Sequence, residues 1–112
     1  MSATAAMTIG EKLRLVAAAD VAPGAVVRWS APGRRALAVY NVDGTFFVTD
    51  DRCTHGMGSL SEGFLDGDVI ECPWHGGAFN VRTGAAAAMP CSEPIRTYPA
   101  TVEQGFVVID YR

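Results

Sequence analysis

The chain has 112 residues, enough for one domain that buries a core without disulfide bonds. Of these residues 49% are hydrophobic and 19% are charged, and the net charge of −3 gives no basic excess that would indicate binding to nucleic acid or to an anionic membrane. No apolar stretch reaches the length of a transmembrane helix, and the N-terminal residues lack the charge and apolar run of a signal peptide.

The first half of the chain reads as short strands separated by turns. Strands are predicted at residues 12–18, 25–29, 36–41 and 45–50. Pro32 and Gly33 mark a turn between the second and third of these strands. Asp43 and Gly44 predict a tight hairpin between the third and the fourth.

The second half continues the same pattern. Strands are predicted at residues 68–71, 78–81, 95–103 and 106–110, the last two joined at Gln104 and Gly105. Residues 84–91 contain four alanines, but Gly84 and Pro90 bound them so closely that we expect a loop. Because every strand is short and turns recur throughout, we predict an all-β fold, a small antiparallel sandwich or barrel. Residues 1–112 are expected to form a single domain, with residues 1–10 as a loose N-terminal segment.

Two short segments hold both histidines of the chain and two of its three cysteines. Residues 53–58 read CTHGMG, and residues 72–77 read CPWHGG. Both segments are expected on loops between strands, side by side, where a rigid β scaffold can present ligands. Four candidate metal ligands then converge from the two loops: Cys53, His55, Cys72 and His75.

Two thiolates and two imidazoles suit two kinds of metal centre. A tetrahedral structural zinc site can take this set, although zinc fingers usually draw two ligands of one kind from each loop. Here each segment supplies one cysteine and one histidine, which favours a binuclear iron–sulfur site with both cysteines on one iron and both histidines on the other. Four unrelated core residues are a third interpretation, which does not explain why both histidines stand beside cysteines.

The stretch from residue 53 to residue 84 resembles the cluster-binding region of Rieske ferredoxins, with Cys-x-His, sixteen residues, and then Cys-x-x-His. The resemblance extends more weakly to residues 37–53 and 94–110. It is greatest to the ferredoxin component of bacterial aromatic-ring dioxygenase systems of the biphenyl and naphthalene type. It implies an antiparallel β protein that carries one Rieske-type [2Fe–2S] cluster at its tip, in loops within about residues 50–84.

The resemblance also implies the ligands and the role of the cluster. Cys53 and Cys72 would bind the inner iron, and His55 and His75 the outer, more exposed one. A flavin-containing NAD(P)H reductase would supply single electrons, and the terminal oxygenase of a multicomponent dioxygenase would receive them. The alternatives are a Rieske small subunit of a larger reductase, such as an assimilatory nitrite reductase, and a zinc-binding interaction module.

The chain is not expected to be an enzyme itself. A Rieske oxygenase needs a second, mononuclear iron held by two histidines and a carboxylate, and no histidine remains once the cluster is filled. Three cysteines without an export signal favour a reducing compartment over a disulfide framework. We therefore expect a cytoplasmic monomer that binds neither nucleic acid nor membrane.

The residues around the ligands predict a reduction potential near the low end of the Rieske range. The Rieske proteins of cytochrome bc complexes carry a disulfide and two hydroxyl donors at positions that correspond here to Gly58, Trp74, Gly77 and Phe79. Fewer hydrogen-bond donors stabilise the reduced, more negative cluster less. Six acidic residues near the ligand loops have two interpretations: they add to this effect and attract a basic partner surface, or they are only a solvated charged face of a hairpin. They are Asp50, Asp51, Glu62, Asp66, Asp68 and Glu71.

Two further side chains near the ligands have competing interpretations. Trp74 is either an exposed contact for redox partners or a cover that excludes water from the cluster. Cys91 has no histidine near it and lies in a proline-flanked loop, and we interpret it as a small buried or partly buried thiol and not as a redox group. The aromatic residues expected in the core are Trp29, Phe46, Phe47, Phe79 and Phe106.

Overall fold

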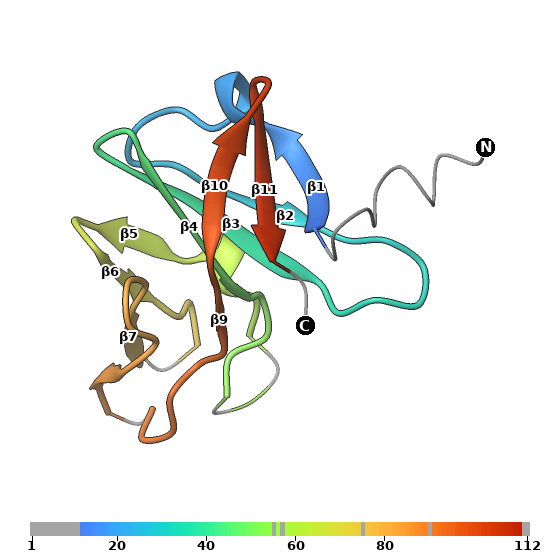
Figure 1. The fold of residues 1–112 in the computed structure, drawn as a ribbon. Helices are drawn as coiled ribbons and strands as arrows, with labels where there is room; N and C mark the ends of the chain where they lie inside the picture. Colours follow the sequence, from blue (N-terminus) through green and yellow to red (C-terminus); the bar gives the residue numbers. More distant parts are fainter. Residues whose placement is uncertain (1–11, 55, 57, 75, 90, 111–112) are drawn as a thin grey trace.

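The structure is a computed structural model of the chain and describes residues 12–54, 56, 58–74, 76–89 and 91–110 (Figure 1). The described residues form three antiparallel sheets and two 3-10 turns, Ala18–Asp20 and Leu60–Glu62. The predicted all-β fold is confirmed. No helix in the described part of the chain has both the length and the apolar character needed to cross a membrane. The N-terminal segment 1–10 lies outside the described residues.

Two of the sheets pack together around a shared apolar core. The first has the order β1-β11-β10, with β1 Lys12–Ala17, β11 Phe106–Asp110 and β10 Ala100–Glu103. The second has the order β2-β3-β4-β9, with β2 Val26–Trp29, β3 Leu37–Val42, β4 Thr45–Asp50 and β9 Thr97–Tyr98. Leu13, Val39 and Ile109 are among the residues of their common core. The core thus holds the two sheets together, and the first and last strands of the described chain, β1 and β11, are neighbours within the first sheet.

The third sheet is built of three-residue strands and lies beside the other two (Figure 1). It has the order β5-β6-β7-β8, with β5 Phe64–Asp66, β6 Val69–Glu71, β7 Ala78–Asn80 and β8 Ala86–Ala88. Its core is a second apolar cluster that includes Leu60, Ile70 and Phe79 and also contains all three cysteines of the chain. The cysteines are therefore part of the hydrophobic core that holds the third sheet to the rest of the molecule.

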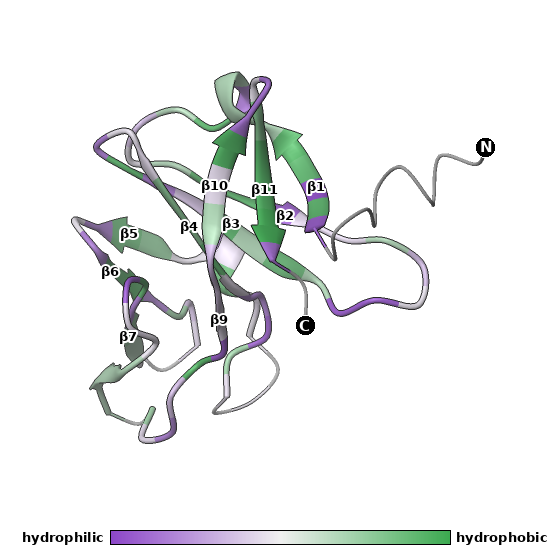
Figure 2. Cartoon of the chain, viewed as in Figure 1, coloured by the Kyte–Doolittle hydropathy of each residue, from purple (hydrophilic) through white to green (hydrophobic). Residues whose placement is uncertain are grey.

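The two tight hairpins form where the local sequence predicts them. Asp43 and Gly44 have φ values of 52° and 90°, and Gln104 and Gly105 have φ values of 53° and 83°. A two-residue turn with both residues in the left-handed region matches the natural twist of the strands that it connects. Figure 2 shows hydrophilic residues at the tip between β10 and β11 and apolar residues along the strands below it.

Two predicted elements are wrong in detail. The predicted loop 84–91 contains β8, because Gly84, with φ of 83°, turns the chain back so that the alanines pair with β7. The predicted strand 95–103 is broken at Pro99, which has no N–H for a ladder, so β9 pairs with β4 and β10 with β11. The chain thus crosses from one sheet to another at the proline.

The prediction of core aromatics is only partly right. Phe79 is completely buried, whereas the other four are half-buried: Trp29, Phe46 and Phe47, which pack against the cores, and Phe106, whose ring lies under the guanidinium of Arg14. Tyr40 on β3 is also fully buried, which the sequence does not predict. Its hydroxyl makes a 2.8 Å hydrogen bond with Thr49 Oγ1, which compensates for burying a polar group.

Candidate metal centre

Cys53 and Cys72 are buried next to each other although neither forms a disulfide. Cys53 follows β4 and is 3% exposed, and Cys72 follows β6 and is 1% exposed. Burial raises the pKa of the Cys72 thiol, and its interaction with Cys53 raises it further. The structure therefore brings together the two predicted cysteine ligands. His55 and His75, the two predicted histidine ligands, lie outside the described residues.

The two segments that hold the predicted ligands are closed by the same backbone hydrogen bond. The N–H of Cys53 donates to the carbonyl oxygen of Gly58 at 2.9 Å, and the N–H of Cys72 donates to that of Gly77 at 2.7 Å. In each case the bond joins a cysteine to the glycine five residues later. An isolated β-bridge between Arg52 and Ser59 extends the closure of the first loop. The first segment is thus a closed loop after β4, and the second is the turn of the β6–β7 hairpin.

The two loops touch at Gly58. A β-carbon at this residue would lie 2.7 Å from Cys72 Sγ and 3.0 Å from Trp74 Cδ1, both on the second loop. There is no room for a side chain at this position, so glycine permits the close approach. The expectation that the two segments lie side by side is confirmed.

The surroundings of the two sulfurs fit an iron–sulfur cluster. The N–H of Trp74 lies 3.5 Å from Cys72 Sγ and donates to it, which lowers the pKa of that thiol. The buried Cys72 thiol would be costly to ionise alone, but a coordinated metal removes the proton of a ligand thiol and compensates the charge. The donor set of buried sulfurs with a backbone N–H directed at one of them therefore suits a thiolate-bound cluster.

Cys91 is buried beside Cys53, in the same apolar cluster as Cys53 and Cys72. It is 3% exposed, and its Sγ lies 3.5 Å from Cys53 Sγ. Burial and the neighbouring Cys53 raise the pKa of Cys91 to about 12. The predicted burial of this thiol is confirmed, but the sequence contains no signal for the contact because the two cysteines are 38 residues apart.

Arginines distant in the sequence reduce the negative charge expected around the ligand loops. Asp51 is 2% exposed, and its Oδ2 lies 3.2 Å from Arg28 Nε while its Oδ1 accepts the N–H of Ser61 at 2.8 Å. Asp50 pairs with Arg35 at 3.6 Å. The predicted attraction for a basic partner is therefore weaker than composition implies. Three of the six acidic residues are in ion pairs: Asp50, Asp51 and Asp68.

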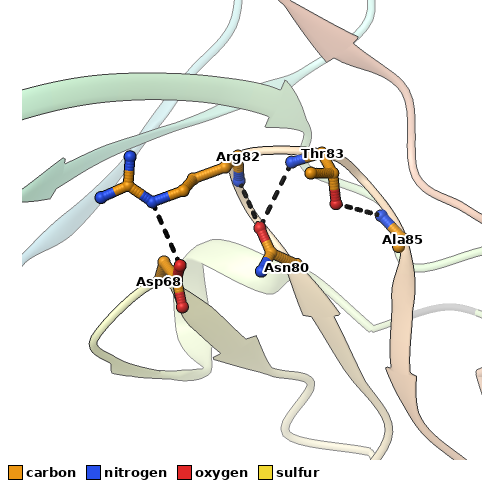
Figure 3. A network of polar contacts seen from close by, with 5 residues as sticks. All are labelled: Asp68, Asn80, Arg82, Thr83 and Ala85. Carbon is orange, nitrogen blue, oxygen red and sulfur yellow. Dashed lines mark hydrogen bonds and ion pairs between the residues drawn. The ribbon is translucent and has the colours of Figure 1, made fainter.

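Arg82 connects the third sheet to the second. Its Nε lies 3.1 Å from Asp68 Oδ2 (Figure 3), and its guanidinium lies over the ring of Phe47 on β4, 4.8 Å from the centroid. Figure 3 also shows Asn80 Oδ1 accepting the backbone N–H groups of Arg82, at 2.8 Å, and Thr83, at 3.3 Å. This network fixes the turn after β7 and with it the orientation of the third sheet.

Two exposed apolar side chains belong to the segments that carry Cys72 and Cys91. Trp74 is 54% exposed although its ring contacts Gly58, and Met89, two residues before Cys91, is 77% exposed. Trp74 thus covers part of the contact between the loops and at the same time presents apolar surface to solvent. Both interpretations of Trp74 from the sequence agree with this position.

Comparisons with known proteins point to one family. The model of the family described as "Rieske [2Fe-2S] domain" matches residues 11–99, which include both ligand segments. The ferredoxin component of the p-cumate 2,3-dioxygenase system of Pseudomonas putida is 54% identical over 97 residues, which are 86% of this chain and 82% of that protein.

Solved structures agree with the sequence comparisons. The ferredoxin of Sphingomonas yanoikuyae B1 superimposes with a TM-score of 0.86 at 54% identity, covering 90% of this chain and 99% of that one. A chain from the complex of reduced oxygenase and oxidized ferredoxin in carbazole 1,9a-dioxygenase also has a TM-score of 0.86, at 48% identity, covering 91% of this chain and 95% of that one.

Proposed function

This chain belongs to the Rieske [2Fe-2S] domain family, and on that premise we propose that it is the ferredoxin component of an aromatic-ring dioxygenase system. It carries single electrons on one Rieske-type [2Fe–2S] cluster and has no catalytic site of its own. The names of its relatives, such as the ferredoxin component of the p-cumate 2,3-dioxygenase system, support this role. So does the structural likeness to the ferredoxin of Sphingomonas yanoikuyae B1, which covers 90% of this chain.

We assign the ligands to the two closed loops. Cys53 and Cys72 bind one iron, and His55 and His75 bind the other. The observation that carries this assignment is the burial of the two cysteine sulfurs side by side, at the base of two loops closed by matching Cys-to-Gly hydrogen bonds. With neutral histidines, the oxidised cluster and its ligands sum to zero formal charge, whereas four cysteines would give a dianion. Adding an electron is therefore easier, and the potential is higher, than in a four-cysteine ferredoxin.

The electron enters from a flavin-containing NAD(P)H reductase and leaves to a terminal oxygenase. Support for the oxygenase comes from a relative of similar fold that is seen in complex with one. The exposed apolar side chains of Trp74, whose ring contacts the first ligand loop, and of Met89, two residues before Cys91, offer a surface that a partner could contact to receive an electron. The protein acts as a monomer in the cytoplasm, where reducing conditions keep its cysteines free.

Single substitutions of the three cysteines test the ligand assignment with a built-in control. Cys53→Ser and Cys72→Ser remove proposed ligands, whereas Cys91→Ser changes a neighbouring buried cysteine that is not a ligand. We expect the visible absorbance, the iron and the acid-labile sulfide to be largely lost in the first two and retained in the third. His55→Ala and His75→Ala should also be poorly loaded and unable to support electron transfer to an oxygenase. A colourless wild-type protein that contains zinc would overturn the assignment, as would a His75→Ala protein that transfers electrons normally.

A further inference from the structure

We propose that the thiol of Cys91 donates a hydrogen bond to Cys53 Sγ and thereby raises the reduction potential of the cluster. This inference rests on the proposed assignment of Cys53 as an iron ligand. It makes Cys91 a positioning residue that acts on the cluster through its ligand, and it replaces the expectation that Cys91 is only a core thiol.

The contact between the two sulfurs is close and shielded from water. The two Sγ atoms lie 3.5 Å apart, and each residue is 3% exposed. A thiol is a weak donor, but in a dry environment no water competes for the acceptor, and electrostatic interactions are stronger than in solvent. The geometry alone permits either cysteine to be the donor.

Iron binding determines which cysteine donates. A cysteine that coordinates iron is a thiolate and has no proton to give. Cys53 can then only accept, so Cys91 must be the donor. The bond offsets negative charge on the ligand sulfur, and this stabilises the reduced cluster, which carries one more electron, more than the oxidised one.

Contacts from both ligand loops hold Cys91 in position. On the first loop, Thr54 Oγ1 donates to the carbonyl oxygen of Glu93 at 3.0 Å. On the second loop, the α-carbon of Gly77 lies against Cys91, so that a β-carbon there would overlap Cys91 Sγ and lie 3.2 Å from its backbone nitrogen. The N–H of Cys91 also donates to the carbonyl oxygen of Ala88 at 3.1 Å. The thiol is therefore packed toward Cys53 and has little space in which to turn away.

This donor offsets part of the loss of hydrogen-bond donors that the sequence predicts. Gly77 and Phe79 stand where other Rieske proteins are expected to have hydroxyl donors, and the lack of those donors predicts a low potential. Cys91 can approach this point only because residue 77 has no side chain. The chain thus replaces a hydroxyl donor with a thiol donor to a ligand sulfur.

The test compares the cluster-loaded wild-type protein with Cys91→Ala and Cys91→Ser by anaerobic spectroelectrochemical titration. At a fixed applied potential we expect the ratio of reduced to oxidised cluster to fall about three- to tenfold in Cys91→Ala, where tenfold corresponds to about 59 mV for one electron. Cys91→Ser keeps a donor and should recover at least part of the loss. Ser92→Ala, a change at the exposed side chain next to Cys91, should leave the ratio unchanged. An unchanged or raised ratio in Cys91→Ala would overturn the proposal.

An infrared measurement on the wild-type protein gives a second readout that needs no variant. If Cys53 and Cys72 bind iron, Cys91 carries the only S–H group among the three cysteines of the chain. Its S–H stretching band should move to lower frequency when the cluster is reduced, because the acceptor sulfur becomes more negative. A band that does not move on reduction contradicts the hydrogen bond. A wild-type protein that shows no reversible one-electron bleach at all would instead contradict the proposed function.

Discussion

The indole ring of Trp74 lies against Gly58 so closely that a β-carbon at residue 58 would come within 3.0 Å of the ring atom Cδ1. The same β-carbon would lie 2.7 Å from the sulfur of Cys72. The two ligand loops therefore meet at a point that admits only a hydrogen atom, and the absence of a side chain at residue 58 lets the first loop approach Cys72.

Gly58→Ala should weaken cluster binding. The new methyl group must displace either the sulfur of Cys72, which iron would hold in place, or the ring of Trp74, and overpacking of this kind costs about 1–3 kcal/mol. We expect less iron and less visible absorbance per chain, together with a lower thermal unfolding midpoint. Gly56→Ala is the matched control, because a β-carbon at that residue would meet nothing within 4 Å. Equal loading of the two variants would show that the loops have more freedom than the contact implies.

Arg28→Met should destabilise the protein through Asp51. The substitution leaves a buried carboxylate with the N–H of Ser61 as its partner but without its cation, at a cost of about 1–3 kcal/mol. The urea midpoint of unfolding should fall, and adding Asp51→Asn should recover part of the loss because the unpaired charge is gone. Arg35→Met is the comparison, since its 3.6 Å pair with Asp50 is longer and more exposed and should contribute at most about 1 kcal/mol. A loss in Arg35→Met as large as in Arg28→Met would contradict the special role of the buried carboxylate.

Arg82→Leu should loosen the third sheet selectively. It removes both the ion pair with Asp68 and the contact with the ring of Phe47, which together contribute about 1 kcal/mol. Hydrogen exchange should become faster for amides of β6 and β7 and stay nearly unchanged in β3. Asp68→Asn keeps the ring contact and should have the smaller effect. Uniform acceleration over all strands would mean that Arg82 stabilises the whole fold and not this junction.

Tyr98 should make stability depend on pH in the alkaline range. Burial, followed by the 2.6 Å hydrogen bond that its hydroxyl donates to Asp50 Oδ1, raises the pKa of Tyr98 to about 12 from an ordinary value of 10.0. Because the folded-state pKa is raised, this stabilisation is complete below about pH 10 and is lost as the pH rises toward about 12. Tyr98→Phe should cost about 1 kcal/mol at neutral pH and should flatten the fall in unfolding free energy between pH 10 and 12. The difference between the ultraviolet pH titrations of the wild-type protein and Tyr98→Phe gives the tyrosinate signal of Tyr98. A midpoint of this difference near the ordinary value of 10.0 would contradict the prediction.

Features set by neighbouring residues could be predicted from the sequence. The turn at Asp43 and Gly44 depends on two residues that tolerate positive φ, and the spacing of the cysteines with the histidines by itself indicates a metal centre. The closed loops that carry Cys53 and Cys72 agree with that prediction, while the ligand roles of all four residues stay predictions: Cys53, His55, Cys72 and His75.

Features set by packing between distant segments could not be predicted. The three alanines that form β8 have no strand pattern of their own, and they pair with β7 only because Gly84 reverses the chain. In the same way, Arg28 neutralises Asp51, and Cys91 contacts Cys53, only because separate elements pack together. These contacts modify the charge and the hydrogen bonding around the ligand loops, and composition alone gives a misleading estimate of both.

The most direct test of the central claim is an anaerobic spectroelectrochemical titration of the purified wild-type protein. We predict a coloured protein that bleaches reversibly with one electron, with a midpoint in the lower part of the Rieske range of about −150 to +300 mV. A colourless protein with bound zinc, or a coloured protein whose spectrum does not respond to reduction, would contradict the assignment of this chain as a Rieske electron carrier.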